Sequence, residues 1–326
     1  MILVVGGAGY IGSHMCRLLR ERGLDHLVFD NMSAGHAEAV AGSQVVEGDL
    51  RNADVLDRTF GDHSISCVMH FAAHISVGES VREPAKYFDN NTVGVLTLLN
   101  AMIRNRVDKF VFSSTAAIFG EPLYVPIDED HPKAPTSPYG ESKLMVERIL
   151  SAYDTAYALK SVCLRYFNAA GADPSGEIGE DHSPEEHLIP VAIQAATGQR
   201  PPLKIFGTDY DTVDGTCVRD YIHVNDLAEA HVLAYEHLSG GGDSRQYNLG
   251  NGKGFSVRDV IRTVERVIGS EVPHDDADRR PGDPATLIAS PDKIRNDWGW
   301  SPRFPDLETI VRHAWGWHRA HPNGYV

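Results

Sequence analysis

Cysteine is scarce in this chain of 326 residues, and long apolar runs are missing from it. The four cysteines are widely spaced and form no C-x-x-C pair; they are Cys16, Cys67, Cys163 and Cys217. This usage is typical of free thiols in a reducing compartment. No apolar run approaches the ~20 residues of a membrane-spanning helix, and no basic segment precedes the first apolar run. The sequence therefore predicts a soluble, cytoplasmic protein that does not enter a membrane.

Basic charge is also in short supply. Against 45 Asp+Glu the chain has 30 Lys+Arg, which gives a net charge of −15 with neutral histidine. Such a balance disfavours nucleic acid and anionic membranes as partners, so local features must hold any phosphate-bearing ligand. The 16 histidines are scattered, without an H-E-x-x-H pattern. We therefore expect no metal site.

The first half of the chain alternates apolar runs with helical patterns. The expected strands are Ile2–Gly6, His26–Asp30, Gln44–Glu47, Ser66–Ala72, Lys109–Ser114 and Ser161–Phe167. The expected helices are Gly9–Arg22, Ala53–Phe60, Pro84–Arg106 and Tyr139–Tyr157, with Ser256–Ile268 and Leu307–Ala320 further on. This alternation predicts an α/β fold with a doubly wound parallel sheet of the Rossmann type. Beyond Asn168 the composition shifts and predicts a second, smaller mixed α/β domain.

A glycine pattern follows the first expected strand. Gly6 permits a tight turn, Gly9 lets backbone N–H groups approach a pyrophosphate, and Gly12 allows the helix to pack closely on the strand. The second strand ends in Asp30, whose carboxylate can accept hydrogen bonds from the ribose hydroxyls of NAD and would repel the 2′-phosphate of NADP. Asp30 could instead form a turn ahead of Asn31. The context favours NAD as the cofactor.

Two further strand ends are candidates for the same site. Asp49 follows the third strand, and Phe71, Ala72 and Ala73 close the fourth. Ligands of open α/β sheets bind at the carboxyl ends of strands. Asp49 could receive the adenine amino group, or it could be a helix N-cap.

Catalytic chemistry is indicated by Thr115, Tyr139 and Lys143. Tyr139 and Lys143 are four residues apart, so they share one face of a helix. A nearby ammonium favours the phenolate, and so does the positive nicotinamide of NAD. Tyr139 can then serve as the general acid and base of an alcohol–ketone interconversion, with Thr115 relaying the proton.

Over essentially its whole length the chain resembles the UDP-galactose 4-epimerase family, a branch of the extended short-chain dehydrogenases/reductases. The matching stretches include GGAGYIGSH at 6–14, VGES at 77–80, SPYGESKLMVE at 137–147, RYFN at 165–168, GTCVRDYIHV at 215–224, YNLG at 247–250 and RRPGD at 279–283. The resemblance implies reversible 4-epimerisation of a UDP-hexose with tightly held NAD. It also implies an NAD-binding domain at 1–168, rejoined by about 222–250, and a discontinuous substrate-binding domain at 169–326.

The resemblance also assigns roles to individual residues. Tyr139 would be the base, Lys143 the ribose anchor and Thr115 the relay. The implied cofactor-binding residues are Gly6, Gly9, Tyr10, Ile11, Gly12, Asp30, Asn31, Asp49, Leu50, Phe71, Ala72, Ala73, Asn90, Ser113, Tyr139, Lys143 and Tyr166. The implied substrate-binding residues are Thr115, Asn168, His187, Leu188, Arg219, Arg280, Asp283 and Leu287.

Some positions depart from the family pattern. Val5 stands where the family often has Thr, which should affect hydrogen bonding in the turn and not the chemistry. Ile75 stands where several members have a cofactor-contacting Lys, so the cofactor could be held less tightly. His187 replaces a common Asn and could instead be a solvent-facing loop histidine. Leu287 replaces a bulky aromatic of members that reject N-acetylated sugars, or it packs under the uridine loop.

Other enzymes with this fold catalyse different reactions. Sugar-nucleotide dehydratases place Asp-Glu directly after the relay Thr, and the related decarboxylases place a Glu there. Here the residues are Ala116 and Ala117, which cannot transfer protons. A non-catalytic NAD-binding sensor would have no need of the three catalytic side chains together. A homodimer formed through the segments at 84–106 and 139–157 is expected by analogy.

Overall fold

The computed structural model describes residues 1–280 and 282–325. Pro281, inside the RRPGD motif, and Val326, at the end of the expected second domain, lie outside the described residues. The chain divides into two compact units. Unit 1 comprises Met1–Gly120, Pro132–Arg165 and Ala228–Tyr247; unit 2 comprises Glu121–His131, Tyr166–Leu227 and Asn248–Val326.

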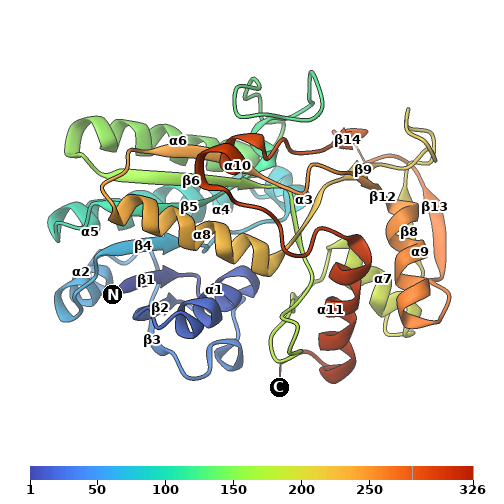
Figure 1. Cartoon of the computed structure of the whole chain (residues 1–326), viewed down its shortest axis with the longest axis horizontal. Helices are drawn as coiled ribbons and strands as arrows, with labels where there is room; N and C mark the ends of the chain where they lie inside the picture. The colour runs from blue at the N-terminus through green and yellow to red at the C-terminus, as the bar shows by residue number, and fades with distance from the viewer. Residues whose placement is uncertain (281, 326) are drawn as a thin grey trace. The chain divides into compact units, whose positions relative to one another are not determined.

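A seven-stranded sheet forms the centre of unit 1 (Figure 1). Its strands are β1 (Ile2–Val5), β2 (His26–Asp30), β3 (Gln44–Glu47), β4 (Cys67–His70), β5 (Lys109–Thr115), β6 (Lys160–Tyr166) and β11 (Arg245–Leu249). Their order is β11-β6-β5-β4-β1-β2-β3, and the pairs β1–β2, β2–β3, β1–β4 and β4–β5 are parallel. The order reverses direction at β1 and β4, which is the switch point of a Rossmann-type sheet. The expected doubly wound fold is confirmed.

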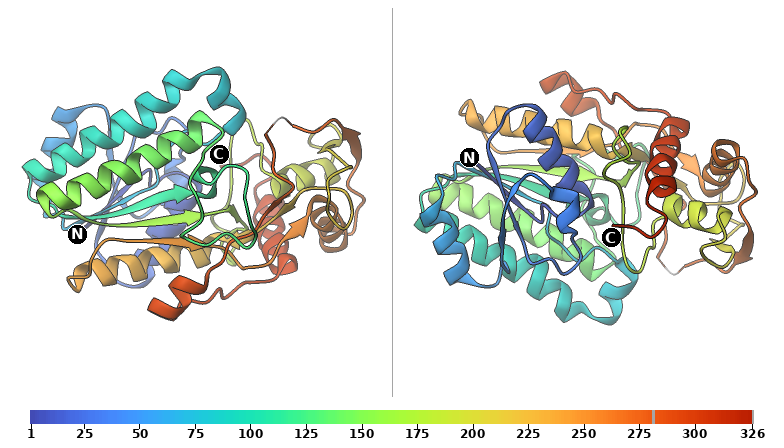
Figure 2. Two further views of the ribbon diagram at one scale, coloured as in Figure 1. Left: turned by 90° about the horizontal axis from the view of Figure 1, so that it is seen from above. Right: turned by 90° about the horizontal axis from the view of Figure 1, so that it is seen from below.

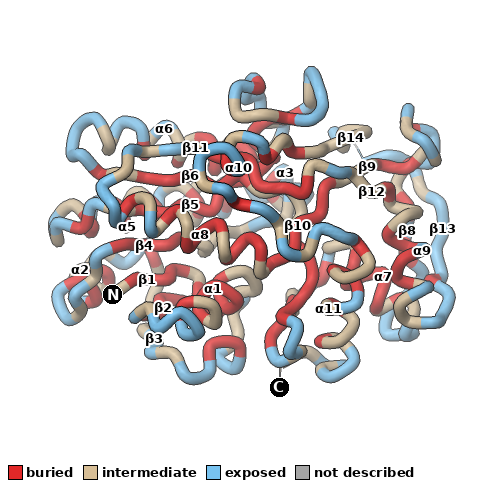
Figure 3. The backbone as a smooth tube through the Cα atoms, in the orientation of Figure 1, coloured by how far each residue is buried: buried red, intermediate tan, exposed pale blue. Residues whose placement is uncertain are grey.

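Helices cover both faces of this sheet. They are α1 (Tyr10–Glu21), η1 (Ala37–Val40), α2 (Ala53–Asp62), α3 (Val77–Arg82), α4 (Pro84–Phe88), η2 (Asp89–Gly94), α5 (Val95–Arg104), η3 (Ala116–Ile118), α6 (Pro138–Tyr157) and α8 (Val224–Ser239). The two views of Figure 2 place α5 and α6 on one face and α1 and α8 on the other. Because the strands are buried on both faces, they read as unbroken apolar runs, and Figure 3 shows β4 and β5 buried.

Several expected elements shift by one or two residues at their ends, and two differences bear on the site. The stretch expected as a helix at 84–106 contains a π-helical segment of six residues, η2, between α4 and α5. Such segments are rare and often occur at functional sites; apolar periodicity does not reveal them. The fourth strand was expected to reach Ala72 but ends at His70. Phe71 and Ala72 instead donate their backbone N–H groups to the oxygen of Val5, at 2.7 and 3.2 Å.

Unit 2 is a mixed assembly of small sheets and helices. Its strands are β7 (Asn168–Ala170), β8 (Leu203–Phe206), β9 (Val218–Arg219), β10 (Tyr221–His223), β12 (Phe255–Ser256), β13 (His274–Ala277) and β14 (Thr286–Leu287). They pair as β10–β7, β13–β8 and β12-β9-β14. Its helices are α7 (Leu188–Ala196), α9 (Val257–Ile268), α10 (Asp292–Trp298) and α11 (Leu307–Ala320). A core that includes Ile193, Ile205, Val264 and Ile310 joins α7, α9 and α11 to these strands.

Two general findings concern the described residues as a whole. None of their helices combines the length and apolar character needed to cross a membrane. Cys16, Cys67, Cys163 and Cys217 are buried free thiols. Burial raises the pKa of Cys16 and of Cys67 to about 12, so neither thiol is reactive at neutral pH.

Candidate active site

The glycine turn between β1 and α1 has the geometry that its spacing predicts. Gly6 has φ +75°, and a Cβ there would lie 2.4 Å from the backbone nitrogen of Ala72. A Cβ on Gly12 would lie 2.2 Å from the oxygen of Gly6, so only glycine lets the helix approach the turn. At Gly9 a Cβ would meet nothing nearer than 3.5 Å, so this side of the turn is open. Gly9 caps α1 without a side-chain hydrogen bond, which leaves first-turn N–H groups for an anion.

Asp30 ends β2 beside this turn and is buried. One carboxylate oxygen accepts a hydrogen bond from the backbone N–H of Ala8 at 2.9 Å, and the other from that of Met32 at 2.9 Å. The carboxylate therefore holds both the glycine turn and the turn after β2. The turn-forming interpretation of Asp30 is confirmed, and a cofactor role has to use its remaining lone pairs.

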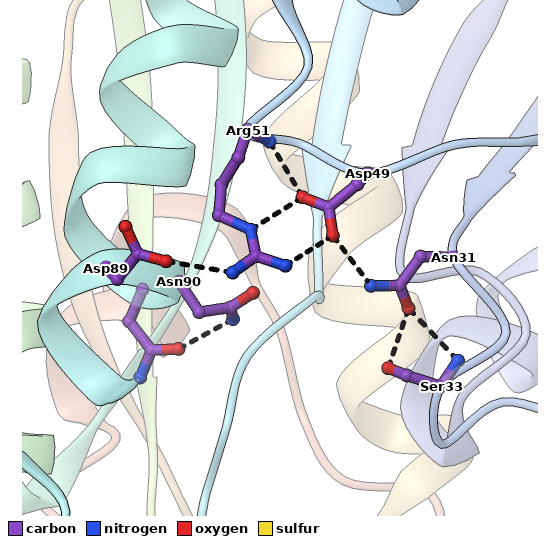
Figure 4. Close-up of polar contacts among 7 residues, drawn as sticks. Asn31, Ser33, Asp49, Arg51, Asp89 and Asn90 are labelled. Atoms are coloured by element: carbon purple, nitrogen blue, oxygen red, sulfur yellow. Dashed lines mark hydrogen bonds and ion pairs between the residues drawn. The ribbon is translucent and has the colours of Figure 1, made fainter. Parts of the chain in front are cut away.

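Asp49 is not a helix cap, because Asn52 caps α2 by accepting a hydrogen bond from Val55. Its carboxylate binds Arg51 instead, at 2.7 and 2.8 Å, and Arg51 also bonds Asp89 at 2.8 Å (Figure 4). The Arg51 guanidinium holds the pKa of Asp49 well below its usual range. Asn31 donates to Asp49 at 3.3 Å. The sequence pattern did not reveal Arg51, which ties the end of β3 to η2.

Asn90 and Asn91 lie in η2, beside the end of β4. Asn90 donates to the side-chain oxygen of Asn91 at 3.0 Å, and buried Asn91 exchanges hydrogen bonds with the backbone of His74 at 2.9 and 3.0 Å. This contact fixes the segment after the predicted cofactor residues Phe71–Ala73. Ile75, the departure from a family Lys, is 44% exposed and offers the cofactor no charge.

The predicted catalytic residues come together where β5 ends and α6 begins. Ser137 caps α6 by accepting a hydrogen bond from Gly140, so Tyr139 lies in the first turn and Lys143 one turn further on. A hydrogen bond joins the side chains of Tyr139 and Thr115; burial raises the pKa of the Tyr139 phenol, and this bond opposes the rise. Without a further positive charge, the tyrosine is therefore a neutral proton donor.

Lys143 is buried and charged groups are few around it. Its ammonium donates to the backbone oxygen of Ser113 at 3.0 Å and lies 4.9 Å from the centre of the Phe112 ring. Burial lowers the pKa of Lys143 to about 7. His70, at the end of β4, is fully buried, and burial together with Lys143 lowers its pKa to about 3. This histidine is thus neutral and adds no charge to the site.

Glu147 supports the catalytic helix from within unit 1. It accepts a hydrogen bond from Ser114 at 2.6 Å and two from Arg165 at 2.7 and 3.0 Å. These contacts join α6 to β5 and β6. A buried ion pair with further hydrogen bonds is costly to break, so Glu147 and Arg165 are positioning residues that the sequence pattern alone did not identify.

The predicted substrate residues of unit 2 are engaged with one another. Arg219 and Asp283 form an ion pair, although the family resemblance implies a diphosphate contact for the first and a ribose contact for the second. The guanidinium of Arg280 lies 3.9 Å from the centre of the Phe206 ring. Leu287 pairs with Arg219 in parallel register between β14 and β9. Asn168, at the start of β7, donates to the backbone oxygen of Asp220 at 2.9 Å.

Asp220 organises this part of unit 2 and was not predicted. Its carboxylate accepts backbone hydrogen bonds from Asn251 at 2.8 Å, Gly252 at 3.0 Å and Ala289 at 3.2 Å. Three segments distant in sequence therefore meet at one side chain beside Arg219. Burial raises the pKa of Asp220 to about 6, although the three N–H groups oppose the rise.

The side chain of His187 is 43% exposed, but its ring is held by two carboxylates. The residue caps α7, immediately before the predicted contact Leu188, and its ring nitrogen Nδ1 lies 2.8 Å from Glu185 and 2.9 Å from Glu180. His182 joins the same group. Although burial lowers the pKa of His182, Glu180 and Glu185 raise it to about 9.

Known proteins are similar to this chain in sequence and in fold. Residues 2–250 match the model of the NAD dependent epimerase/dehydratase family. A UDP-glucose 4-epimerase of Halalkalibacterium halodurans is 56% identical over 324 residues, which are 99% of this chain and 97% of that protein. A crystal structure of a UDP-glucose 4-epimerase covers 100% of this chain and 99% of its own, with a TM-score of 0.98 and 49% identity.

A further structure, of the Brucella ovis UDP-glucose 4-epimerase in complex with NAD, covers 96% of both chains with a TM-score of 0.94 and 47% identity. These similarities extend over both units and include the Thr115, Tyr139 and Lys143 region. The chain belongs to the NAD-dependent epimerase/dehydratase family and, within it, to the UDP-glucose 4-epimerases.

Proposed function

We propose that this chain interconverts UDP-galactose and UDP-glucose by transient oxidation at C4 of the sugar. The 4-keto sugar then rotates in the site, and hydride returns to the opposite face of C4. The observation that carries the proposal is the hydrogen-bonded pair of Thr115 and Tyr139 one helical turn from the buried ammonium of Lys143. The two alanines after Thr115 offer no second acid–base pair for dehydration or decarboxylation.

Unit 1 has the features that NAD binding requires. The uncapped start of α1 and the open side of Gly9 suit a pyrophosphate, and Asp30 at the end of β2 suits a ribose without a 2′-phosphate. Asn31, Asp49, Leu50, Asn90, Ser113 and Tyr166 would complete the site, together with residues 71–73. When bound, NAD supplies the group that accepts hydride from C4 and returns it.

The residues of this chain would then move the proton. Tyr139 takes the proton of the C4 hydroxyl, directly or through Thr115, and gives it back after rotation. Tyr139 is neutral in the ligand-free chain, so we expect the positive nicotinamide and Lys143 together to lower its pKa when the site is loaded. Lys143 would also anchor the nicotinamide ribose.

Unit 2 would hold the UDP-sugar. Arg219 and Arg280 present planar guanidinium groups that suit diphosphate oxygens, and Asn168 would add an amide. Asp283 would bind the uridine ribose, which requires it to release Arg219 to the phosphates. His187, Leu188 and Leu287 would line the remainder of the site.

Oligomeric state and location are part of the proposal. Val93 is 50% exposed in η2 and Tyr157 is 55% exposed at the end of α6. Both lie in the segments expected to form a homodimer, and exposed apolar side chains there are suited to an interface. Buried, unreactive thiols are consistent with a cytoplasmic protein.

The proposal is tested by redox balance. Purified protein supplied with UDP-galactose should give UDP-glucose with no net accumulation of NADH, measured by chromatography of the sugar nucleotides and by NADH absorbance. Release of NADH in proportion to product would identify a dehydrogenase. A product from which water or carbon dioxide has been eliminated would identify a lyase. UDP-N-acetylgalactosamine and UDP-xylose assayed in parallel define the sugars accepted.

A further inference from the structure

Four metal-ligating side chains converge in unit 2 at the start of α7. They are Glu180, His182, Glu185 and His187, and one ligand atom from each lies within 4.8 Å of the others. Three of them belong to the loop between β7 and α7, and His187 caps the helix. The spacing matches none of the familiar zinc motifs, which is why the sequence predicted no metal.

Each ring nitrogen faces both carboxylates. His187 Nδ1 lies 2.9 Å from Glu180 Oε1 and 2.8 Å from Glu185 Oε1. His182 Nδ1 lies 3.4 Å from Glu180 Oε1 and 3.5 Å from Glu185 Oε2. A tetrahedral ion with bonds of ~2.1 Å holds its ligand atoms about 3.4 Å apart. The two separations of His182 match that value, and the two of His187 are shorter by about 0.5 Å.

Glu180 Oε1 is paired with the two rings by charge, but no ring N–H is well aligned with it. A ring nitrogen carries at most one hydrogen, and His187 Nδ1 is positioned to share it with Glu185 Oε1. Glu180 Oε1 is buried and makes no hydrogen bond of normal geometry, although two ring nitrogens lie within 3.4 Å. Leaving a buried carboxylate oxygen in that state is costly. A cation among the four atoms would satisfy it.

Burial and charge point the same way. The side chains of Glu180 and Glu185 are each 4% exposed, so their two negative charges have lost most of their water. Arg200 donates to the backbone oxygen of Glu185 and to Gln194 and does not neutralise them. Without an ion the two carboxylates hold the pKa of His182 and of His187 above the ordinary value, so the protonated rings balance the charge. A doubly charged cation would displace these two protons and balance the same carboxylates.

We propose that Glu180, His182, Glu185 and His187 form a binding site for one divalent transition-metal ion of the zinc type. Two imidazole nitrogens and two carboxylate oxygens suit such an ion, whereas Mg²⁺ and Ca²⁺ prefer oxygen ligands alone. The side chains of His182 and His187 are 21% and 43% exposed, which gives the ion a path from solvent. The ion joins the loop after β7 to the first turn of α7 and fixes the ring of His187.

The test uses cobalt as the probe and the full chain as the sample. Protein purified with a chelator, and then freed of it, is titrated with Co²⁺ and followed by visible absorption. We expect d–d bands that rise to an end point at one ion per chain and collapse when Zn²⁺ is added. The readout is metal binding, so the result is independent of the epimerase proposal.

Two variants make the assignment specific. The double variant Glu180→Gln/Glu185→Gln should weaken Co²⁺ binding by more than about 100-fold, because even residues behind the ligands are worth 10–100-fold. Glu186→Gln removes an exposed carboxylate beside the cluster and should bind as the wild type does. A wild-type titration without an end point would leave only a hydrogen-bonded network and overturn the proposal. Undiminished binding by the double variant would overturn it as well, since the ion would then lie elsewhere.

Discussion

The ammonium of Lys143 donates a 3.0 Å hydrogen bond to the backbone oxygen of Ser113, two residues before Thr115. This bond joins the first turns of α6 to the end of β5, so it sets the position of Tyr139 relative to the strand that carries its hydrogen-bond partner. The same burial that makes the contact well defined lowers the pKa of Lys143 to about 7. Position and protonation of this lysine are therefore linked.

We expect Lys143→Met to stabilise the nucleotide-free protein by about 1–3 kcal/mol at pH 6 while abolishing most activity, because a buried ammonium is removed. The wild-type pKa of about 7 lies below its ordinary value of 10.5. Between these values the unfolded chain binds more protons than the folded chain, so wild-type stability rises with pH. The advantage of the variant should be full below pH 7 and shrink as pH rises. Urea unfolding at pH 6 and pH 9 checks this; a variant less stable at pH 6 would contradict it.

Tyr139→Phe should lower turnover by at least ~10²–10⁴-fold, the usual value of a general acid–base group. Thr115→Val should lose less, because Tyr139 can reach the substrate directly or through water. The matched control is Tyr153→Phe, which removes a hydroxyl on the same helix that bonds Asn100 at 2.7 Å. Rates of UDP-galactose conversion and circular dichroism separate loss of chemistry from loss of fold. Near-normal turnover in Tyr139→Phe would exclude it as the base.

The spacing of residues in the sequence was sufficient to predict the features that neighbouring residues form. The glycines at 6, 9 and 12 and the pair Tyr139 and Lys143 depend on one turn or one helix, so their geometry follows from residue type and separation. The doubly wound parallel sheet follows from the alternation of buried strands with helices. These were predicted and then found.

Features that depend on contacts between distant segments could not be predicted from the sequence. The three donors to Asp220 come from residues 251, 252 and 289, and Arg51 meets Asp89 from 38 positions away. The ion pair of Arg219 with Asp283 also joins distant segments. A π-helical segment has the same apolar spacing as its neighbours over so short a length. Tertiary contact, which no single-sequence pattern records, decides all four.

Arg51→Gln should weaken NAD retention by about 10-fold, which corresponds to ~1.4 kcal/mol. Arg51 joins Asp49 at the end of β3 to Asp89 in η2, and its loss frees two segments that carry predicted cofactor residues. Stability should change little, because exposed ion pairs contribute only ~0–1 kcal/mol. Arg104→Gln is the matched control: its side chain is also 48% exposed and pairs with Asp57. The measurement is the amount of NAD that remains bound to each variant after gel filtration. Equal retention by the two variants would show that the Arg51 bridge has no role in binding.

Leu287 is the residue from which we infer substrate breadth. It lies partly buried on β14, in register with Arg219, and its backbone oxygen accepts a 3.0 Å hydrogen bond from Asp220. Because the backbone is held by the strand, a change of side chain should alter the space around the sugar and leave the strand in place. Leu is smaller than Tyr and has no hydroxyl to satisfy, so an acetamido methyl could occupy the volume beside C2, while its amide would need polar partners or water.

We therefore expect measurable activity on UDP-N-acetylglucosamine and UDP-N-acetylgalactosamine. Leu287→Tyr should abolish that activity and spare UDP-galactose, because the aromatic ring fills the space beside C2. Leu287→Met is the control, since it nearly conserves volume and should leave both activities within a few-fold of wild type. The ratio of kcat/KM for the two sugar classes is the measurement. If Leu287→Tyr lowers both activities equally, Leu287 packs under the uridine and does not select the sugar; if the wild type has no N-acetyl activity, other side chains fill the space.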